Sequence, residues 1–278
     1  MKPLCIPLSQ APELINQVLI LIEESFGYEK GQSFEVDFLP LIEKANWNNF
    51  YLTVDTSNRV TSCGGFREVT LQTSQKTLSS AFIGGIATRV DQRAQGLGRI
   101  MLETLLAKLA AKELVILWSD QISFYEKFGF KEFGFLYENI GSDWTSENTT
   151  RPLTLLTEGE RNHIISHYQD FHYRFGISPI RSKKNWETIF QMKSVHCSLF
   201  PWGYLFVGKG MDLPGIIHEA ACHPDYEREL KNKLAAYHYW LHASFLHTQQ
   251  TRFAGLIRPA PHLELDLSEI FIPGVDSI

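Results

Sequence analysis

Residues 83–99 read IGGIATRVDQRAQGLGR and pass directly from a strand pattern into an amphipathic helix. Within this stretch, residues 93–98 (RAQGLG) contain two glycines, which let the backbone approach another molecule closely. Backbone amides at the start of a helix point outward, and the positive end of the helix dipole lies behind them. The stretch therefore predicts an anion-binding loop, for which pyrophosphate is the natural occupant.

The same loop differs from two common nucleotide-binding motifs. It does not have the spacing G-x-x-x-x-G-K-[ST] that binds nucleoside triphosphates. It also lacks the G-x-G-x-x-G spacing, followed about 20 residues later by a ribose-binding acid at a strand end, that binds dinucleotides. Triphosphate and dinucleotide ligands are therefore excluded.

The apolar residues on either side of the loop alternate between strand and helix periods. The expected elements are a strand at 4–8, helices at 12–27 and 34–44, strands at 49–55, 59–72 and 78–90, a helix from residue 97, a strand at 114–118, a short helix at 120–128 and a strand at 130–137. The run 114–118 (LVILW) is almost continuously apolar, which is typical of a strand buried on both faces. This order predicts an α/β (α+β) fold with a mixed central sheet flanked by helices.

The second half of the chain follows a stretch rich in Ser, Thr, Asn and Gly without apolar periodicity. We expect the linker there, at 141–151, between a domain at 1–140 and a second, smaller domain at 152–278. The elements expected in the second domain are helices near 158–174 and 182–193, strands near 196–207 and 215–220, a long helix from Pro224 to about His247, and a strand at 252–258.

Composition and charge exclude several classes of protein. The 278 residues include 26 basic and 31 acidic ones, for a formal charge of −5, so no nucleic-acid partner is expected. No apolar run approaches the roughly 20 residues that cross a bilayer, and the first apolar stretch contains acids, unlike a signal peptide. The four cysteines form no C-x-x-C pair, so neither a disulfide framework nor a zinc ribbon is expected. We expect a cytoplasmic protein with reduced thiols and no membrane partner.

Two motifs resemble those of the GNAT acetyltransferase superfamily. Residues 84–88 (GGIAT) and the loop at 93–98 resemble the family's acetyl-CoA-binding motif, R/Q-x-x-G-x-G/A after a strand. Residues 124–130 (FYEKFGF) resemble the family's FYEKLGF segment. The motifs stand in the family's order, separated by a helix and a strand, and the resemblance covers residues 3–138 as a fold. It implies a GNAT N-acetyltransferase domain that uses acetyl-CoA as co-substrate.

The resemblance also implies which residues bind acetyl-CoA. In the family, two neighbouring parallel strands separate at a bulge, and the pantetheine arm lies in the gap like an added strand. Gly84-Gly85 is the expected bulge. Arg93 and Arg99 either add charge to the phosphate site or are solvated residues at a helix start. The implied contacts are the backbone of Ile86, Ala87 and Thr88 and the loop of Arg93, Ala94, Gln95, Gly96, Leu97, Gly98 and Arg99.

Acyl transfer by direct attack needs an acid for the leaving thiolate, a donor for the oxyanion and a group that takes the proton of the amine. By resemblance, Tyr125 is the acid. Its ordinary pKa of about 10 exceeds the roughly 8.5 of a thiol, so it stays protonated at neutral pH. The backbone amide of Ile86 is the expected oxyanion donor.

The base is not set by the motifs. Family members commonly carry a glutamate on the strand that here reads AFIGGIATRV, at 81–90, which contains none. Glu68 on the preceding strand is the first candidate, and Glu24 and Asp120 are the alternatives. A solvated surface carboxylate is the competing interpretation for each of them.

Two histidine pairs have the spacing of metal ligands on a helix, His163 with His167 and His238 with His242. Neither pair has the acid of an H-E-x-x-H motif, so positions on amphipathic helices are the preferred interpretation. No metal cofactor is expected.

The second half resembles, more weakly, the degenerate GNAT-like unit of two-unit bacterial acetyltransferases, at residues 181–186, 203–207 and 215–219. It has no R-x-x-G-x-G loop, so a second acetyl-CoA site is not expected. Its expected role is to form a wall of the acceptor cleft or to support assembly. A homodimer is one form that such an assembly can take.

The expected function is that of an acetyl-CoA-dependent N-acetyltransferase acting on an amine of a small molecule or peptide. The alternative is a catalytically silent GNAT-fold protein that binds acyl-CoA as a sensor or scaffold. The missing strand glutamate favours the alternative, whereas Tyr125 and the intact phosphate loop favour the enzyme.

Overall fold

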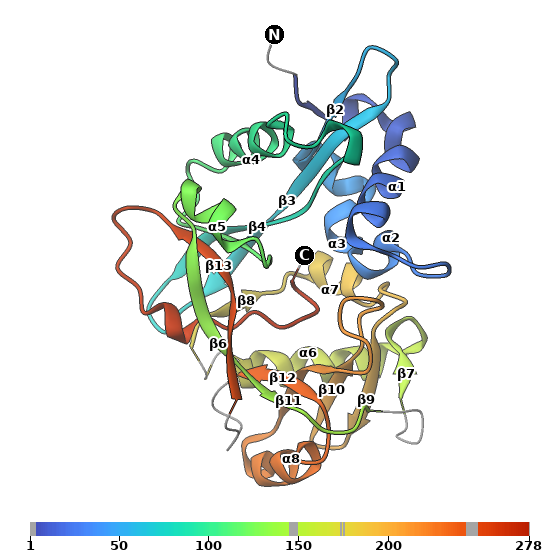
Figure 1. Ribbon diagram of the computed structural model, residues 1–278. Coiled ribbons are helices and arrows are strands. Elements are labelled where there is room, and N and C mark those ends of the chain that lie inside the picture. Colours follow the sequence, from blue (N-terminus) through green and yellow to red (C-terminus); the bar gives the residue numbers. More distant parts are fainter. Residues whose placement is uncertain (1–3, 145–149, 173, 175, 243–249, 278) are drawn as a thin grey trace.

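The computed structural model describes residues 4–144, 150–172, 174, 176–242 and 250–277, and one mixed sheet runs through both halves of the chain (Figure 1). The strands are β1 (Ile6–Pro7), β2 (Phe50–Val54), β3 (Val60–Gln72), β4 (Thr77–Thr88), β5 (Leu114–Leu117), β6 (Lys131–Asn139), β7 (Arg151–Pro152), β8 (Ser178–Ile180), β9 (His196–Phe200), β10 (Gly203–Val207), β11 (Ile217–Cys222), β12 (Tyr239–His242) and β13 (Gln250–Pro259). Their order across the sheet is β1-β2-β3-β4-β5-β13-β6-β12-β11-β10-β9-β7, and β8 pairs with β3. The α-helices are α1 (Ile15–Phe26), α2 (Phe34–Asp37), α3 (Leu39–Ile42), α4 (Leu97–Lys108), α5 (Ile122–Tyr125), α6 (Glu158–His172), α7 (Lys183–Ile189) and α8 (Glu227–Leu234).

Helices cover both faces of the sheet in the first half, as the upper part of Figure 1 shows. Helix α1 buries an apolar face that includes Val18 and Ile22 in one core cluster. Helix α4 buries Met101 and Leu105 in a second cluster, on the other side of the strands. The predicted mixed sheet flanked by helices is confirmed.

Strand β13 comes from the end of the chain but completes the sheet of the first half. It pairs antiparallel with β5 on one side and with β6 on the other, and its Leu256 and Ile257 are buried. The predicted strand at 252–258 is therefore present, between strands of the first half. Strand β6 also pairs with β12, so the two halves share one sheet. The division into domains at 141–151 stays a prediction.

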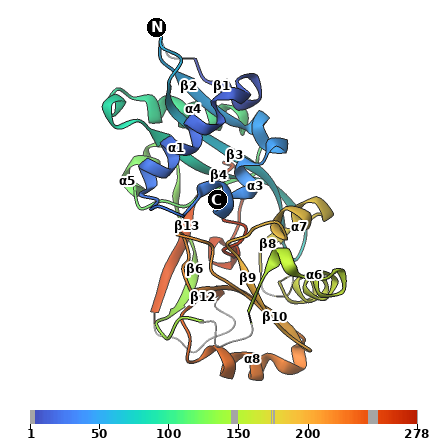
Figure 2. The same ribbon diagram turned by 90° about the vertical axis from the view of Figure 1, so that its right-hand side faces the viewer.

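The second half is a smaller α/β unit. Strands β9 and β10 form a hairpin, β10 pairs with β11, and helices α6, α7 and α8 surround these strands (Figure 2). Tyr168 of α6, Trp186 of α7 and Tyr204 of β10 meet in its core. None of the helices in the described ranges combines the length and the apolar character needed to cross a membrane.

Proline divides two of the predicted elements. Residues 34–44 contain two short helices, α2 and α3, because Pro40 has no amide hydrogen with which to continue the hydrogen bonds of α2. The predicted strand at 196–207 is the hairpin of β9 and β10, which turns at Pro201 and Trp202. Proline cannot donate to a sheet, so the break falls there.

The long helix predicted from Pro224 to His247 is wrong. Helix α8 ends at Leu234, and strand β12 follows after a short turn. Tyr239 and Leu241 of this strand are buried, where β12 pairs with β11 and β6. Pairing within the sheet therefore overrides the helical pattern of these residues. The end of the predicted helix, at 243–247, lies outside the described residues.

The last described residues, 270–277, run between the two halves (Figures 1 and 2). Asp276 is buried and accepts hydrogen bonds from Arg67 of β3 at 2.9 Å and from Arg181, just after β8, at 2.7 Å. Arg181 also forms an ion pair with Glu219 of β11. Burial alone would raise the pKa of the Asp276 carboxyl, but the two guanidinium groups hold it below its usual range. This network fastens the tail to both halves.

Candidate active site

A cavity of about 900 Å³ lies where the two halves meet. One wall comes from the first half: the end of α1, the end of β4, the residues after β5, and helix α5. The facing wall comes from the loop at 211–213, His218 of β11, strand β13 and the tail. Because these walls belong to distant parts of the sequence, the cavity exists only in the folded chain.

Strands β4 and β5 separate at this cavity. Their parallel pairing ends at Ile83, and just beyond it the register of β4 against β3 shifts opposite Cys63–Gly65. Gly85 lies at this shift with a φ of +63°, a conformation that residues with a side chain rarely adopt. The predicted bulge at Gly84-Gly85 is confirmed.

Ile86, Ala87 and Thr88 follow the bulge and line the cavity. Strand β3 pairs with one edge of this segment, and β5 has left the other edge. The backbone N–H and C=O groups of the second edge need a partner, and an extended chain that carries amide groups can supply one. The structure thus places these three predicted residues beside the cavity, on a strand whose second edge β5 does not cover, although the Ala87 carbonyl already accepts from the Ser62 hydroxyl at 2.8 Å.

The predicted phosphate loop leads into helix α4. In the hydrogen bonds of the described residues, no group accepts from the backbone amides of residues 94–99. Ala94 and Gly96 have φ values of +62° and +79°, and left-handed residues in such loops direct neighbouring N–H groups into one concave, anion-binding surface. The loop therefore offers a run of free donors at a helix start.

The two arginines of this segment differ. Arg93 lines the cavity, and its Nε donates to the Thr88 carbonyl at 3.2 Å. The side chain of Arg99 is 69% exposed and pairs with Glu103 at 2.9 Å. Arg93 is therefore placed to assist the loop, whereas the charge of Arg99 is offset on the outer face of α4.

Tyr125 ends helix α5, lines the cavity and is only 8% exposed. Its ring meets the rings of Phe124 and Phe130 edge-on. Burial raises the pKa of its hydroxyl, the nearby Asp120 carboxylate adds to the rise, and a hydrogen bond with Ser119 partly offsets it. The wall therefore presents a hydroxyl that stays protonated at neutral pH.

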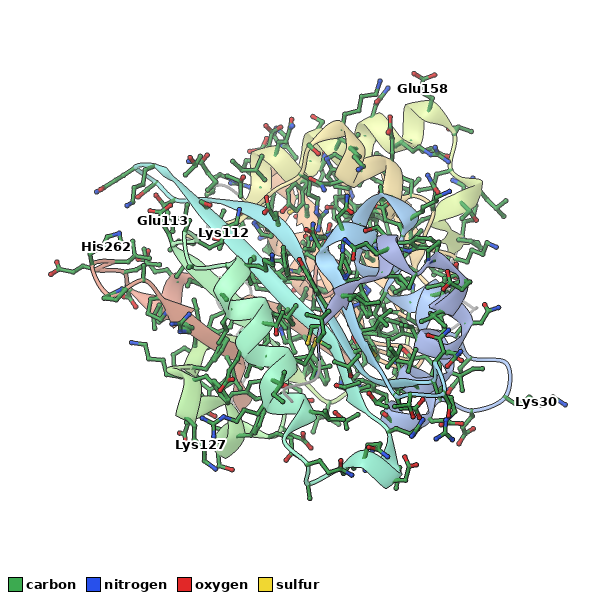
Figure 3. The ribbon with its side chains drawn as sticks, turned by 90° about the horizontal axis from the view of Figure 1, so that it is seen from above. Lys30, Lys112, Glu113, Lys127, Glu158 and His262 are labelled. Atoms are coloured by element: carbon green, nitrogen blue, oxygen red, sulfur yellow. The ribbon has the colours of Figure 1, made fainter. Side chains whose placement is uncertain are left out.

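Glu68 lies outside this site. Glu68 stands opposite Ala81 of β4 in the sheet. Ala81 precedes Ile86 by five residues, so Glu68 lies roughly 16 Å from Ile86 along the strand. Its side chain is 59% exposed and pairs with Lys112 at 3.1 Å; Figure 3 shows Lys112 beside Glu113 toward one side of the molecule. The assignment of Glu68 as the base is therefore corrected: β3 is long, and Glu68 occupies the wrong part of it.

Of the two alternative bases, Asp120 lines the cavity and Glu24 is not part of its wall. Asp120 follows Ser119 after strand β5, and its Oδ1 accepts a hydrogen bond of 3.2 Å from the side chain of Gln121. Its charge contributes to the raised pKa of Tyr125, since both residues belong to the same wall. The structure thus brings Tyr125 and Asp120 together with the open edge of β4.

The facing wall contains residues that no motif indicated. Met211, Asp212 and Leu213 lie in the loop between β10 and β11. The carboxylate of Asp37 accepts a hydrogen bond of 3.1 Å from the Met211 amide, and it packs so closely on Gly210 that a side chain there would collide with it. The glycines around this loop signal a turn in the sequence, but not its contact with a residue 174 positions earlier.

One histidine pair is engaged with the backbone, and the other does not lie on a helix. On α6, His167 Nδ1 donates to the His163 carbonyl at 2.9 Å, and His163 Nε2 lies 3.3 Å from the Gly203 carbonyl. His238 precedes strand β12 instead of lying on a helix. Among the described residues, no group of three or more His, Cys, Asp or Glu side chains is arranged to hold a metal ion.

Residues 9–133 match the family described as the acetyltransferase (GNAT) domain. This range contains the separated strands, the free amides and Tyr125. The first half of the chain is a GNAT domain. No curated protein sequence matches the chain.

Solved structures of GNAT proteins share the fold over most of the chain. A GCN5-related N-acetyltransferase from Kribbella flavida has a TM-score of 0.64 at 14% identity, covering 91% of this chain and 71% of that one. One from Anabaena variabilis has a TM-score of 0.58 at 13% identity, covering 89% and 70%. The N-myristoyltransferase of Saccharomyces cerevisiae with bound myristoyl-CoA has a TM-score of 0.56 at 11% identity, covering 100% and 91%. The likeness therefore includes the second half as well as the GNAT domain.

Proposed function

We propose that this protein is an N-acetyltransferase that moves the acetyl group of acetyl-CoA to a primary amine of a small molecule or peptide. The observation that carries the proposal is an unpaired strand edge and a protonated tyrosine at one cavity, with a loop of free amides that follows directly on Arg93 of the cavity wall. Acetyl-CoA has a matching series of groups: a pantetheine arm with amides, a pyrophosphate and a thioester.

Each group of acetyl-CoA has a partner in this proposal. The backbone of Ile86, Ala87 and Thr88 pairs with the pantetheine amides as an added strand would. The amides of residues 94–99 and the guanidinium of Arg93 bind the pyrophosphate, because free N–H groups at a helix start favour anions. Tyr125 then lies beside the thioester, on the same wall of the cavity.

The reaction is direct transfer. The amine nitrogen attacks the thioester carbonyl carbon, a C–N bond forms, and the C–S bond breaks as the oxyanion collapses. The Ile86 amide donates a hydrogen bond to the oxyanion, which stabilises the charge that develops in the transition state. The Tyr125 hydroxyl donates to the sulfur, passes its proton to the departing thiolate and regains a proton from solvent.

We assign the proton of the attacking amine to Asp120, directly or through a water molecule. Asp120→Asn should lower kcat/KM about 100-fold near pH 7. The loss should shrink at high pH, where the amine is already neutral. Glu68→Gln is the matched control, because it removes an exposed carboxylate outside the cavity. An Asp120→Asn variant as active as the Glu68→Gln variant at pH 7 would exclude Asp120 as the base.

The second half supplies the acceptor wall in this proposal. Its loop at 211–213, His218 and Trp240 line the cavity opposite the GNAT domain. All four cysteines are free thiols, which supports a cytoplasmic location, where thiols stay reduced. The proposal neither requires nor excludes a homodimer, because a single chain already contributes both walls of the cavity.

The rival function is an acyl-CoA sensor without turnover. Release of CoA thiol from acetyl-CoA, measured over a panel of small primary amines and lysine peptides, separates the two functions. We expect release that depends on the amine. Binding of acetyl-CoA without release for any amine would support the sensor instead. The same assay with myristoyl-CoA tests whether the long acyl chain bound by the yeast N-myristoyltransferase is also accepted.

A further inference from the structure

We propose that the acceptor carries a second positively charged group, besides the amine that is acetylated, and that the carboxylate of Asp212 binds this group in the cavity. The acceptor class is then diamines and larger polyamines. This inference rests on the proposed acetyl transfer and names its substrate class.

The carboxylate of Asp212 is available to a ligand. Its side chain is 40% exposed and lines the cavity. Its Oδ2 lies 3.4 Å from the ammonium of Lys209, which is fully buried and makes closer contacts with Ser277, at 2.6 Å to the carbonyl and 3.1 Å to the hydroxyl. Lys209 is not part of the cavity wall. Asp212 therefore presents oxygen toward the cavity while its neighbouring cation is held behind it.

The loop that carries Asp212 is held in place by the first half. The Met211 amide donates to the buried carboxylate of Asp37, and Gly210 packs directly on that carboxylate. Asp37 brings a second negative charge to this wall. Burial raises the pKa of Asp37 and lowers that of Lys209, and the attraction between the two groups opposes both shifts. With these groups charged, Lys209 balances only one of the two carboxylates, and one negative charge remains.

The other titratable groups behind this wall do not cancel that charge. His218 Nε2 donates to the Gly208 carbonyl at 2.9 Å. Burial lowers the pKa of His218 to about 3, so its ring is neutral at pH 7. The buried network behind it contains two arginines and two carboxylates, whose charges sum to zero: Arg67, Arg181, Glu219 and Asp276.

Aromatic rings face the same cavity from the segment between α1 and α3. Phe26, Tyr28 and Phe38 line it, and ring faces attract cations. Burial raises the pKa of the Tyr28 hydroxyl, and the carboxylates of Asp37 and Asp212 add to the rise, so the Tyr28 ring lies near the acidic wall. An ammonium group bound by Asp212 thus lies near the Tyr28 side chain, whereas the face of the Phe38 ring already holds the Lys209 ammonium, 4.1 Å from the ring centroid.

The charged residues of the cavity wall are a cation at the phosphate end and acids elsewhere. Arg93 is the cation of the described wall and belongs to the phosphate end. The acids are Asp120, beside Tyr125, and Asp212, on the facing wall. A diamine matches this arrangement, since one nitrogen reacts beside Asp120 while the other stays protonated against Asp212.

The test compares putrescine and cadaverine with butylamine and pentylamine, which have the same chain lengths and one amino group. The wild-type protein should use the diamines with a kcat/KM about 10- to 100-fold higher, the factor expected for one charge-assisted hydrogen bond. Asp212→Asn should lose most of this preference, mainly through a higher KM for the diamines. Asp212→Glu should recover part of it. Glu35→Gln removes an exposed acid of α2 that is not part of the cavity wall, and it should behave as wild type.

Two results would overturn the inference while leaving acetyl transfer intact: equal use of diamines and monoamines by the wild type, or an unchanged diamine KM in Asp212→Asn. Failure of every amine to release CoA would contradict the proposed function. In that case, calorimetric titration with putrescine still tests whether Asp212 binds the diamine, because Asp212→Asn should bind it at least 10-fold more weakly. Equal affinity of the two proteins for putrescine would also overturn the inference.

Discussion

Arg67 and Asp276, which are 209 residues apart in the sequence, form a buried ion pair with 2.9 Å between Nη2 and Oδ1. Arg181 binds the other oxygen of the same carboxylate at 2.7 Å. The next residue, Ser277, lines the cavity and accepts a hydrogen bond from Lys209 at 2.6 Å. The ion pair therefore positions part of the acceptor wall as well as joining the two halves.

Asp276→Asn should lower the free energy of unfolding by about 3–5 kcal/mol at pH 7, because the buried Arg67 guanidinium loses its counter-charge and Arg181 keeps only Glu219. The pKa of Asp276 is lower in the folded state, so its contribution is present above its unfolded pKa and is lost as the pH falls through the folded value. Urea unfolding curves of the variant and the wild type should thus approach each other in acid. Asp225→Asn, at a side chain 80% exposed, is the control. A loss below about 1 kcal/mol would show that the network adds little.

Tyr125→Phe should lower kcat by about 10²–10⁴-fold and leave the affinity for acetyl-CoA nearly unchanged, because the hydroxyl acts on charge that develops as the sulfur leaves. Steady-state kinetics and calorimetry measure the two quantities. Tyr51→Phe is the matched control, since Tyr51 is equally buried, at 8% exposure, and lies outside the cavity. Full kcat in Tyr125→Phe, under conditions where product release is not limiting, would make Tyr125 a packing residue.

Gly96→Glu should abolish measurable acetyl-CoA binding in calorimetry. Gly96 has a φ of +79°, so a side chain strains the backbone, and no atom lies within 4 Å of where its Cβ would be. The Glu side chain then adds a negative charge beside the amides of the phosphate loop. Gly96→Ala carries the backbone strain without the charge and should retain part of the affinity. Unchanged affinity in a folded Gly96→Glu protein would place the pyrophosphate elsewhere.

Titration with acetyl-CoA should reach one molecule per chain. The second half joins β10 to β11 by an antiparallel connection, and the Gly208 amide in it is already bonded to the Ile216 carbonyl at 3.0 Å. A loop of this kind has no run of free amides leading into a helix. Saturation at two molecules per chain would contradict the interpretation of the second half as degenerate.

Stability should fall as the pH drops below about 6.5, and His218 should account for part of the loss. Burial lowers its pKa to about 3 in the folded state, so between these values the unfolded chain binds a proton that the folded chain does not. The expected slope is roughly 1.4 kcal/mol per pH unit. His218→Gln keeps a donor for the Gly208 carbonyl and should flatten the slope, whereas His223→Gln, at a side chain 56% exposed, should not. Identical slopes in the wild type and His218→Gln would assign the loss to other groups.

Much of the GNAT domain could be predicted from the sequence, because its signals are local. The bulge at Gly84-Gly85 and the loop at 93–98 need particular backbone conformations, and glycine reports those conformations residue by residue. Apolar periods placed α1, β2, β3, β4 and α4 near their observed bounds, since each of these elements buries one face or stripe against the same sheet. The position of Tyr125 after β5 followed from the motif around it.

The acceptor side of the cavity was decided only by the tertiary structure. The sequence around a carboxylate does not indicate which groups it contacts in the fold. Glu68 pairs with Lys112 outside the site, whereas Asp120 lines the cavity, and nothing in the neighbouring residues distinguishes the two. The same is true of strand β12, whose residues follow a helical pattern until pairing with β6 and β11 makes them a strand. Local conformation is thus encoded in neighbouring residues, whereas the wall that selects the acceptor is assembled from contacts between segments far apart in the chain, such as Asp37 with Met211.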